Sequence, residues 1–155
     1  MRRKDREITD AKAIADFIAR EQIIRITFCD ENDIYIVPVN YGYLCKDGND
    51  SFYFHGAKAG RKYELAKQKP LVGFEIDGNY KLLEDEIACK CSARFQSVTG
   101  TGVLQLVDDG EEKQEGLAAI MKQATHKTEW NYSDEMLKTV AVFRLDVDKM
   151  SCKAK

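Results

Sequence analysis

The sequence predicts a mainly β fold, a small β-barrel with flanking helices. About six segments alternate apolar and polar residues over the length of a strand, and turn sequences separate them at regular spacing. Only a few segments have the period of a helix. The chain has 155 residues, of which 44% are hydrophobic, so we expect one domain over residues 1–155 that buries its own core.

The first half of the chain is expected to form one helix and three strands, over residues 9–20, 24–29, 34–43 and 52–55. Thr9 or Asp10 can cap the helix, whose apolar residues recur on one face. The turn sequences Asp30–Asp33 and Lys46–Asp50 separate the strands. Pro38 interrupts the second strand and donates no ladder hydrogen bond, so we expect this strand at a sheet edge or bulged there.

The second half is expected to alternate helices and strands, over residues 61–69, 72–77, 94–107, 110–124, 134–138 and 140–147. The first of these helices stops before Pro70, because proline restricts the residue that precedes it. Residues 78–88 are expected to form a polar connection. Gly100 and Gly102 are expected to bulge or bend the long strand.

Composition narrows the classes of function. A formal net charge of −2 gives no overall field that favours nucleic acid or an anionic membrane. No run approaches the roughly 18 apolar residues of a membrane-spanning helix. The charged start, MRRKDREITD, lacks the apolar core of a secretory signal. We therefore expect a cytoplasmic protein without nucleic-acid or membrane partners.

The cysteines and histidines do not predict a metal site. The five cysteines are odd in number and the chain is not a short secreted scaffold, so we expect reduced thiols. Cys89-x-Cys91 does not have the Cys-x2-Cys spacing of a zinc half-site, and no histidine is near it. The two histidines, His55 and His126, would have to converge in space to share a metal, and their spacing does not require this.

The segment from Ser51 to Lys62 is the strongest candidate for a functional site. Its alternating aromatic and polar residues end at His55, a turn of small residues follows, and Arg61 and Lys62 begin the next helix. Backbone N–H groups, the positive end of a helix and these cations could together hold a phosphate. The alternative is a solvated turn and helix start. The GxGxxG and GxxxxGK[ST] loops are absent, so neither a Rossmann site nor an NTPase loop is supported.

Two interpretations stay open for the side chains around this segment. His55 is either a hydrogen-bonded residue at a strand end or a group close to the chemistry, and no accompanying motif supports a hydrolase triad. Several aromatic residues could flank a flat ring or could belong to the core and interfaces. These aromatic residues are Tyr41, Tyr43, Tyr53, Phe95 and Trp130.

Six segments, taken in chain order, carry a resemblance that covers nearly the whole chain. They are MRRKDREI at the start, IYIVPVNYGY at 34–43, YFHGAKAGRK at 53–62, FQSVTGTG at 95–102, EEKQEGLAAIMKQ at 111–123 and VAVFRLDVDKMSCK at 140–153. With these segments the sequence resembles the pyridoxamine 5′-phosphate oxidase-like flavin proteins. Within them it is most similar to the branch that includes the nitroimidazole-resistance (Nim) proteins.

The resemblance implies a six-stranded antiparallel split β-barrel that forms a homodimer and binds FMN at two sites between the subunits. FAD and a deazaflavin share the phosphate anchor and are the less favoured alternatives. The residues implied beside the isoalloxazine ring are Val37, Pro38, Val39, Asn40 and Tyr41. Those implied near the ribityl chain and ring are His55, Gly56, Ala57 and Lys58. Arg61 and Lys62 would hold the phosphate, and Ser97, Val98 and Trp130 would approach the cofactor from the same or the other subunit.

The function implied is that of a flavin-dependent oxidoreductase, of the kind that reduces nitroimidazoles or other nitroaromatics. Small molecules would supply and accept the electrons, NAD(P)H being one candidate donor, and His55 is the candidate catalytic residue. One alternative is a module that binds or stores flavin or heme without turnover. Another is a barrel dimer without cofactor that serves an interaction role. The chain departs from the family pattern at Ala59, Ala93–Arg94 and Cys152.

Overall fold

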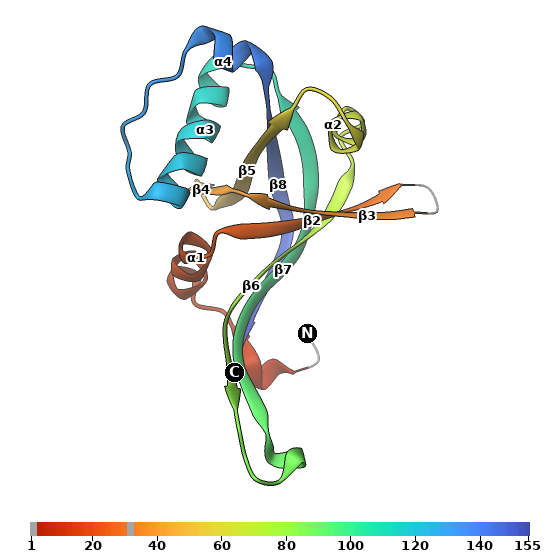
Figure 1. The fold of residues 1–155 in the computed structure, drawn as a ribbon, viewed down its shortest axis with the longest axis vertical. Coiled ribbons are helices and arrows are strands. Elements are labelled where there is room, and N and C mark those ends of the chain that lie inside the picture. Colours follow the sequence, from red (N-terminus) through yellow and green to blue (C-terminus); the bar gives the residue numbers. More distant parts are fainter. Residues whose placement is uncertain (1–2, 31–32) are drawn as a thin grey trace.

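The computed structural model of the protein describes residues 3–30 and 33–155. Its strands form one curved antiparallel sheet (Figure 1). The strands are β1 (Glu7–Ile8), β2 (Ile23–Asp30), β3 (Asp33–Asn40), β4 (Gly42–Lys46), β5 (Asn49–Ala57), β6 (Leu71–Leu83), β7 (Ser92–Val107) and β8 (Val140–Ala154). The helices are α1 (Ala11–Arg20), α2 (Arg61–Ala66), α3 (Gly110–Thr125) and α4 (Asp134–Thr139), with short 3₁₀ turns η1 (Lys4–Arg6) and η2 (Ala88–Lys90).

The order of strands is that of a split barrel. Along the sheet it is β3-β2-β6-β7-β8-β5-β4, and β1 pairs with β8. β3 and β4 are the two edges, so the sheet curves into a barrel without closing by hydrogen bonds. The prediction of a mainly β barrel with flanking helices is confirmed. Within the described residues the sheet has eight strands rather than six.

One additional strand arises because the predicted strand over 34–43 is divided at Tyr41. β3 pairs with β2, whereas β4 pairs with β5 at the opposite edge of the sheet. Tyr41 is buried at this crossing, and its hydroxyl donates a 2.5 Å hydrogen bond to the carbonyl of Ile18. Gly42 follows, and a Cβ there would lie 2.3 Å from the backbone of Ala119 in α3. The expected edge position of Pro38 is confirmed, since it lies in β3.

The segment 78–88, expected to be a polar connection, instead contains the end of β6 and the tip of a long hairpin. β6 and β7 pair as far as Leu83 and Ser92, with a register shift between Gly78 and Lys81. Beyond the barrel both faces of this two-stranded ribbon are exposed to water, so its sequence does not alternate buried apolar and exposed polar residues. The expected irregularity near Gly102 is confirmed, because the β7–β8 register shifts between Thr101 and Gly102.

The helices lie where the sequence predicts them, with small differences at their ends. Asp10 caps α1 by accepting a 2.6 Å hydrogen bond from the backbone of Ala13. Asp109 and Ser133 cap α3 and α4 in the same way. α2 ends at Ala66, three residues earlier than expected. The turn predicted at 30–33 is flanked by the pair Asp30–Asp33, and its two inner positions lie outside the described residues.

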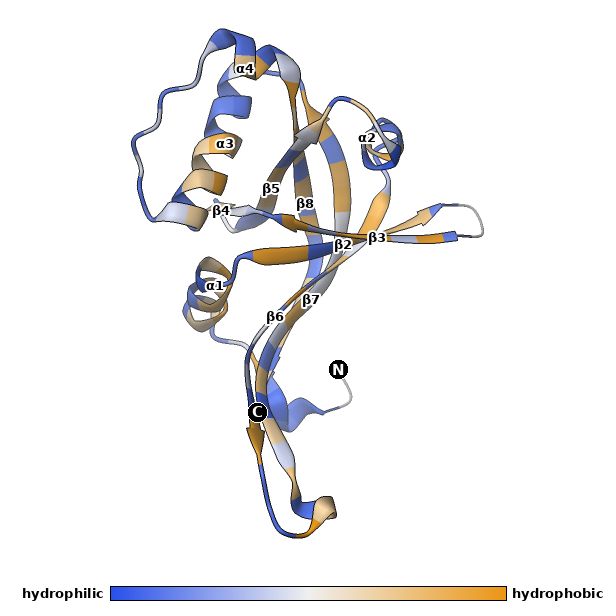
Figure 2. Cartoon of the chain, viewed as in Figure 1, coloured by the Kyte–Doolittle hydropathy of each residue, from blue (hydrophilic) through white to orange (hydrophobic). Residues whose placement is uncertain are grey.

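Two buried clusters hold the sheet and helices together. The larger one fills the barrel and includes Phe52 and Phe54 of β5 with Phe143 of β8. The smaller one lies between α3 and the outer face of β5 and β8, and includes Tyr53 and Val142. Figure 2 shows hydrophobic residues along β2 and on parts of α1 and α3, while the loop between α3 and α4 is mostly hydrophilic. No helix in the described part of the chain is long and apolar enough to cross a membrane.

Candidate functional site

The end of β5 and the start of α2 form the core of the candidate site. β5 pairs with β8 through Gly56↔Ala141 and His55↔Val142, so its last residues are held in a fixed register. The chain then turns at Gly60, which has φ +93°, and α2 begins at Arg61. This arrangement places the two consecutive cations, Arg61 and Lys62, on the first turn of a six-residue helix.

Lys62 places an ammonium group at the end of the barrel core. Its Nζ lies 5.4 Å from the ring centroid of Phe54 and 5.2 Å from that of Phe143. A Cβ on Gly56 would lie 3.1 Å from the same Nζ, so the glycine leaves room for the ammonium. Within residues 3–30 and 33–155, Lys62 has no hydrogen bond or ion pair. Burial lowers its pKa below the usual lysine range. Because a desolvated charge without a counterion is costly, this group favours a bound anion.

Arg61, in contrast to Lys62, already has two acidic partners. Its guanidinium lies 2.7 Å from carboxylate oxygens of both Asp30 and Asp33, at the end of the β2–β3 hairpin. It also lies 4.9 Å from the ring centroid of Tyr35. Hydrogen bonds from Arg61, together with its charge, lower the pKa of Asp33. The two cations that the sequence places side by side therefore have different surroundings, and Arg61 would have to exchange a carboxylate to reach a phosphate.

His55 and Lys58 lie on either side of the Gly56–Ala57 dipeptide. His55 is exposed as a residue, yet the atoms around its imidazole desolvate it enough to lower its pKa, and the charge of Lys62 lowers it further. The imidazole is therefore mainly neutral near pH 7 and can donate one proton and accept another. Lys58 donates a hydrogen bond to the backbone carbonyl of Lys138 in α4.

The segment 37–41 consists of the end of the edge strand β3 and the buried Tyr41. Val37 and Val39 face the barrel core, whereas Pro38 and Asn40 are exposed at the sheet edge. Asn40 donates a 3.1 Å hydrogen bond to the carbonyl of Gln22. The ring of Tyr41 belongs to the core rather than to an open surface.

The three remaining residues expected at the site lie apart from α2. Ser97 and Val98 are buried in the middle of β7, where Val98 pairs with Cys152 of β8. Trp130 is 38% exposed and donates a 3.3 Å hydrogen bond to the carbonyl of Lys127. Figure 1 shows the loop between α3 and α4, which carries Trp130, on the outer side of α3 and far from α2. One copy of the chain does not bring Trp130 to Lys62.

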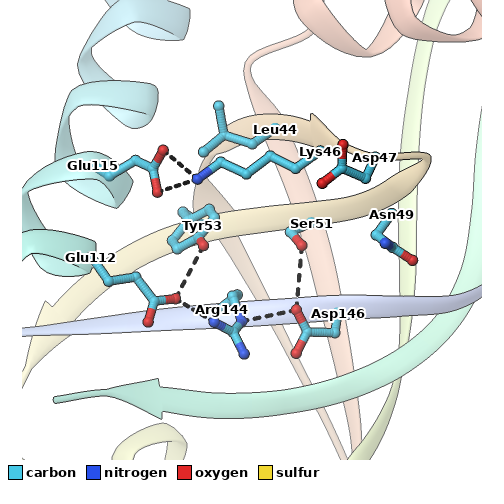
Figure 3. Close-up of a pocket in the computed structure, with 10 residues that line it drawn as sticks. All are labelled: Leu44, Lys46, Asp47, Asn49, Ser51, Tyr53, Glu112, Glu115, Arg144 and Asp146. Carbon is cyan, nitrogen blue, oxygen red and sulfur yellow. Dashed lines mark hydrogen bonds and ion pairs between the residues drawn. The ribbon is translucent and has the colours of Figure 1, made fainter. Parts of the chain in front are cut away.

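The structure also contains a charged hollow of about 300 Å³ between α3 and the strands β4, β5 and β8 (Figure 3), which no pattern in the sequence indicates. At its floor Arg144 pairs with Glu112 of α3 and lies 2.8 Å from Asp146. Tyr53 donates to Glu112 and Ser51 to Asp146, at 3.1 and 3.3 Å.

These groups are paired mostly with one another. Burial disfavours the charge of Arg144, but its two carboxylate partners outweigh that effect and raise its pKa. Burial and the charge of Glu112 raise the pKa of Tyr53 to about 12. At the rim Lys46 pairs with Glu115. The network joins α3 to the sheet, and only the fold could reveal it because its members are far apart in sequence.

Comparison with known proteins identifies the family to which this chain belongs. The family model described as pyridoxamine 5′-phosphate oxidase matches residues 10–154, so the chain belongs to this family. A similar solved structure is a candidate 5-nitroimidazole antibiotic resistance protein from Bacteroides thetaiotaomicron. It is 30% identical with a TM-score of 0.82, covering 96% of this chain and 86% of that one.

Two more distant structures share the fold. The flavocytochrome Anf3 from Azotobacter vinelandii is 17% identical with a TM-score of 0.80, covering 100% of this chain and 72% of that chain. An FAD and heme binding protein from Mycobacterium smegmatis is 13% identical with a TM-score of 0.82, and the match covers 97% of this chain and 73% of that chain. No match was found among curated proteins.

Proposed function

We propose that the protein binds a flavin, FMN in the first instance, and uses it as an oxidoreductase. The observation that carries the proposal is the half-buried ammonium of Lys62, which lies over two aromatic rings and has no acidic partner in the described residues. A phosphate would supply the missing countercharge, so the residues fit the group. The family supports a flavin, and relatives with the same fold include a flavocytochrome and an FAD and heme binding protein.

The proposed assembly is a homodimer in which each cofactor lies between two copies. One reason is that the loop between α3 and α4, which carries Trp130, lies on the far side of α3 from α2 (Figure 1), so a second copy would have to supply that wall. A second reason is the apolar outer side of the edge strand β3, where Ile34 and Ile36 are 59% and 56% exposed. Exposed apolar surface of this kind is typical of an interface.

The chemistry proposed for this chain's own residues is binding, orientation and proton handling. A bound flavin supplies the electron transfer itself. Lys62 would pair with the phosphate, and the free backbone of edge strand β3 beside Pro38 could hydrogen-bond the polar rim of a flat ring. His55, neutral near pH 7, is the proposed residue that holds or moves a proton. The electron donor would be a small molecule such as NAD(P)H and the acceptor a nitroaromatic, in line with the nitroimidazole-resistance relative.

The second candidate is a module that binds flavin or heme without turnover. It is favoured by the same relatives, whose descriptions include heme as well as flavin. The third candidate is a barrel dimer that has lost its cofactor and serves an interaction role.

A spectrum and a reduction experiment distinguish these functions. Purified protein is expected to copurify with, or to take up, FMN, identified by absorbance and mass. NAD(P)H added without oxygen is expected to bleach the flavin band, and a nitroaromatic to restore it. A flavin band that no donor bleaches would favour a module that binds flavin without turnover, and a heme band would favour a heme-binding module. Protein that takes up neither group would contradict the proposal.

A further inference from the structure

The tip of the β6–β7 hairpin carries two cysteines that the proposed flavin site does not use. Figure 1 shows this hairpin projecting from the barrel, away from α2, α3 and α4, and ending in the turn η2. Cys89 lies within that turn and Cys91 directly follows it. Both residues are exposed.

The backbone brings the two cysteines within reach of a bond. A single residue separates them, and two residues of even fully extended chain span only about 7 Å. A 3₁₀ turn is more compact, with a rise of about 2 Å per residue. Both values are compatible with the separation of about 4.4–6.8 Å between Cα atoms that disulfides adopt.

The two thiols have different surroundings. The Sγ of Cys91 lies 3.3 Å from the carbonyl oxygen and 3.4 Å from the backbone nitrogen of Asp85, which fixes it across the turn. Cys89 makes no side-chain hydrogen bond in the part of the chain that the structure describes. A reagent from solution therefore meets Cys89 as the unengaged thiol, with Cys91 held next to it.

The other cysteines cannot form an equivalent pair. Cys29 lies in β2 opposite Ile34, and Cys45 lies in β4 opposite Asp50, so both are on the barrel. Cys152 lies in β8, and its side chain is buried in the barrel core. Within residues 3–30 and 33–155, only the hairpin tip has two exposed thiols separated by a single residue.

We propose that Cys89 and Cys91 are a reversible redox pair that closes to a disulfide within the tip. The oxidant is a low-molecular-weight disulfide. The Cys89 thiolate attacks one of its sulfurs, the reagent's S–S bond breaks, and one thiol leaves with a proton. Cys91 then attacks the Cys89 sulfur, and the second thiol leaves. The two protein thiols lose two electrons and two protons, which the reagent gains as two thiols.

The sequence offers a direct readout, because Lys90 lies between the cysteines. The full-length protein is equilibrated with mixtures of oxidised and reduced glutathione, alkylated under denaturing conditions and cleaved with trypsin. Cleavage after Lys90 gives the peptides Leu82–Lys90 and Cys91–Arg94. In the reduced protein they separate, whereas the proposed bond keeps them joined.

The linked pair of peptides is expected as the main oxidised product, exceeding glutathione adducts at Cys89 by roughly tenfold or more, because the neighbouring thiol has a high effective concentration. Cys91→Ser should instead accumulate the glutathione adduct at Cys89, and Cys45→Ser, an exposed thiol elsewhere, should change nothing. Adducts on both cysteines without linkage, or linkage between different molecules, would overturn the proposal.

Discussion

Replacing Lys62 with methionine is expected to weaken FMN binding by roughly tenfold to a hundredfold. Methionine keeps an unbranched apolar stem over Phe54 and Phe143 and removes only the ammonium. A hydrogen bond to a charged group contributes about 1.5–3 kcal/mol, and about 1.4 kcal/mol corresponds to a tenfold change in Kd. The affinity is measured by titrating FMN with apoprotein and following flavin fluorescence. Riboflavin, which lacks the phosphate, should bind Lys62→Met and the unchanged protein equally.

The matched control is Lys67→Met, one turn further along the same segment. Lys67 is exposed and its ammonium lies 2.7 Å from Glu64, so its loss should leave FMN affinity unchanged. Lys62→Met should also unfold at the same temperature as the unchanged protein or a higher one, because it removes an unpaired half-buried charge. The reasoning is refuted if Lys62→Met is well folded and keeps the same ratio of FMN to riboflavin affinity.

Three further predictions concern the fold and its dependence on pH. Tyr41→Phe should destabilise the protein by about 0.5–1.5 kcal/mol in urea unfolding, at the low end of hydrogen-bond deletions because the carbonyl of Ile18 also accepts from Gln123; no change would mean that the hydroxyl is not held there. Gly42→Ala should destabilise the protein by about 1–3 kcal/mol or more and so lower its melting temperature, since the new Cβ would lie 2.3 Å from the backbone of α3. An unchanged melting temperature would contradict this packing. Folding lowers the pKa of His55 below its unfolded value of about 6.5, so the unfolded chain binds more protons than the folded one as the pH falls through this range, and stability decreases on acidification. His55→Gln should reduce the dependence of the urea midpoint on pH, measured from pH 7.5 to 5.5. An identical pH dependence would assign the effect to other groups.

The sequence was sufficient for elements whose pattern and neighbours agree. β2 alternates apolar and polar residues along its length, and β8 begins where the last alternating segment was expected. The prediction of a single strand over 34–43 was wrong, because the chain crosses from one sheet edge to the other where the ring of Tyr41 is buried against α1 and the core. Because apolar and polar residues continue to alternate through Tyr41, the sequence pattern alone does not indicate that the strand is divided there.

The candidate site was predictable only in its local part. The segment from His55 to Lys62 is continuous in the chain and forms the end of β5 and the start of α2. The different surroundings of Arg61 and Lys62 depend on Asp30 and Asp33, about thirty positions earlier, and on the register that brings Phe143 beside Phe54. Such long-range partners leave no periodic signal in a single sequence.

The position of β8 in the sheet has a consequence for how the protein is made. β8 is the last strand in chain order, yet it lies between β7 and β5 in the interior of the sheet. Until residues 140–154 have left the ribosome, β5 and β7 present unpaired backbone to any other chain. Non-local pairing of this kind also slows folding. Ribosome stalling or truncation before residue 140 should therefore give an aggregation-prone chain rather than a partly working barrel.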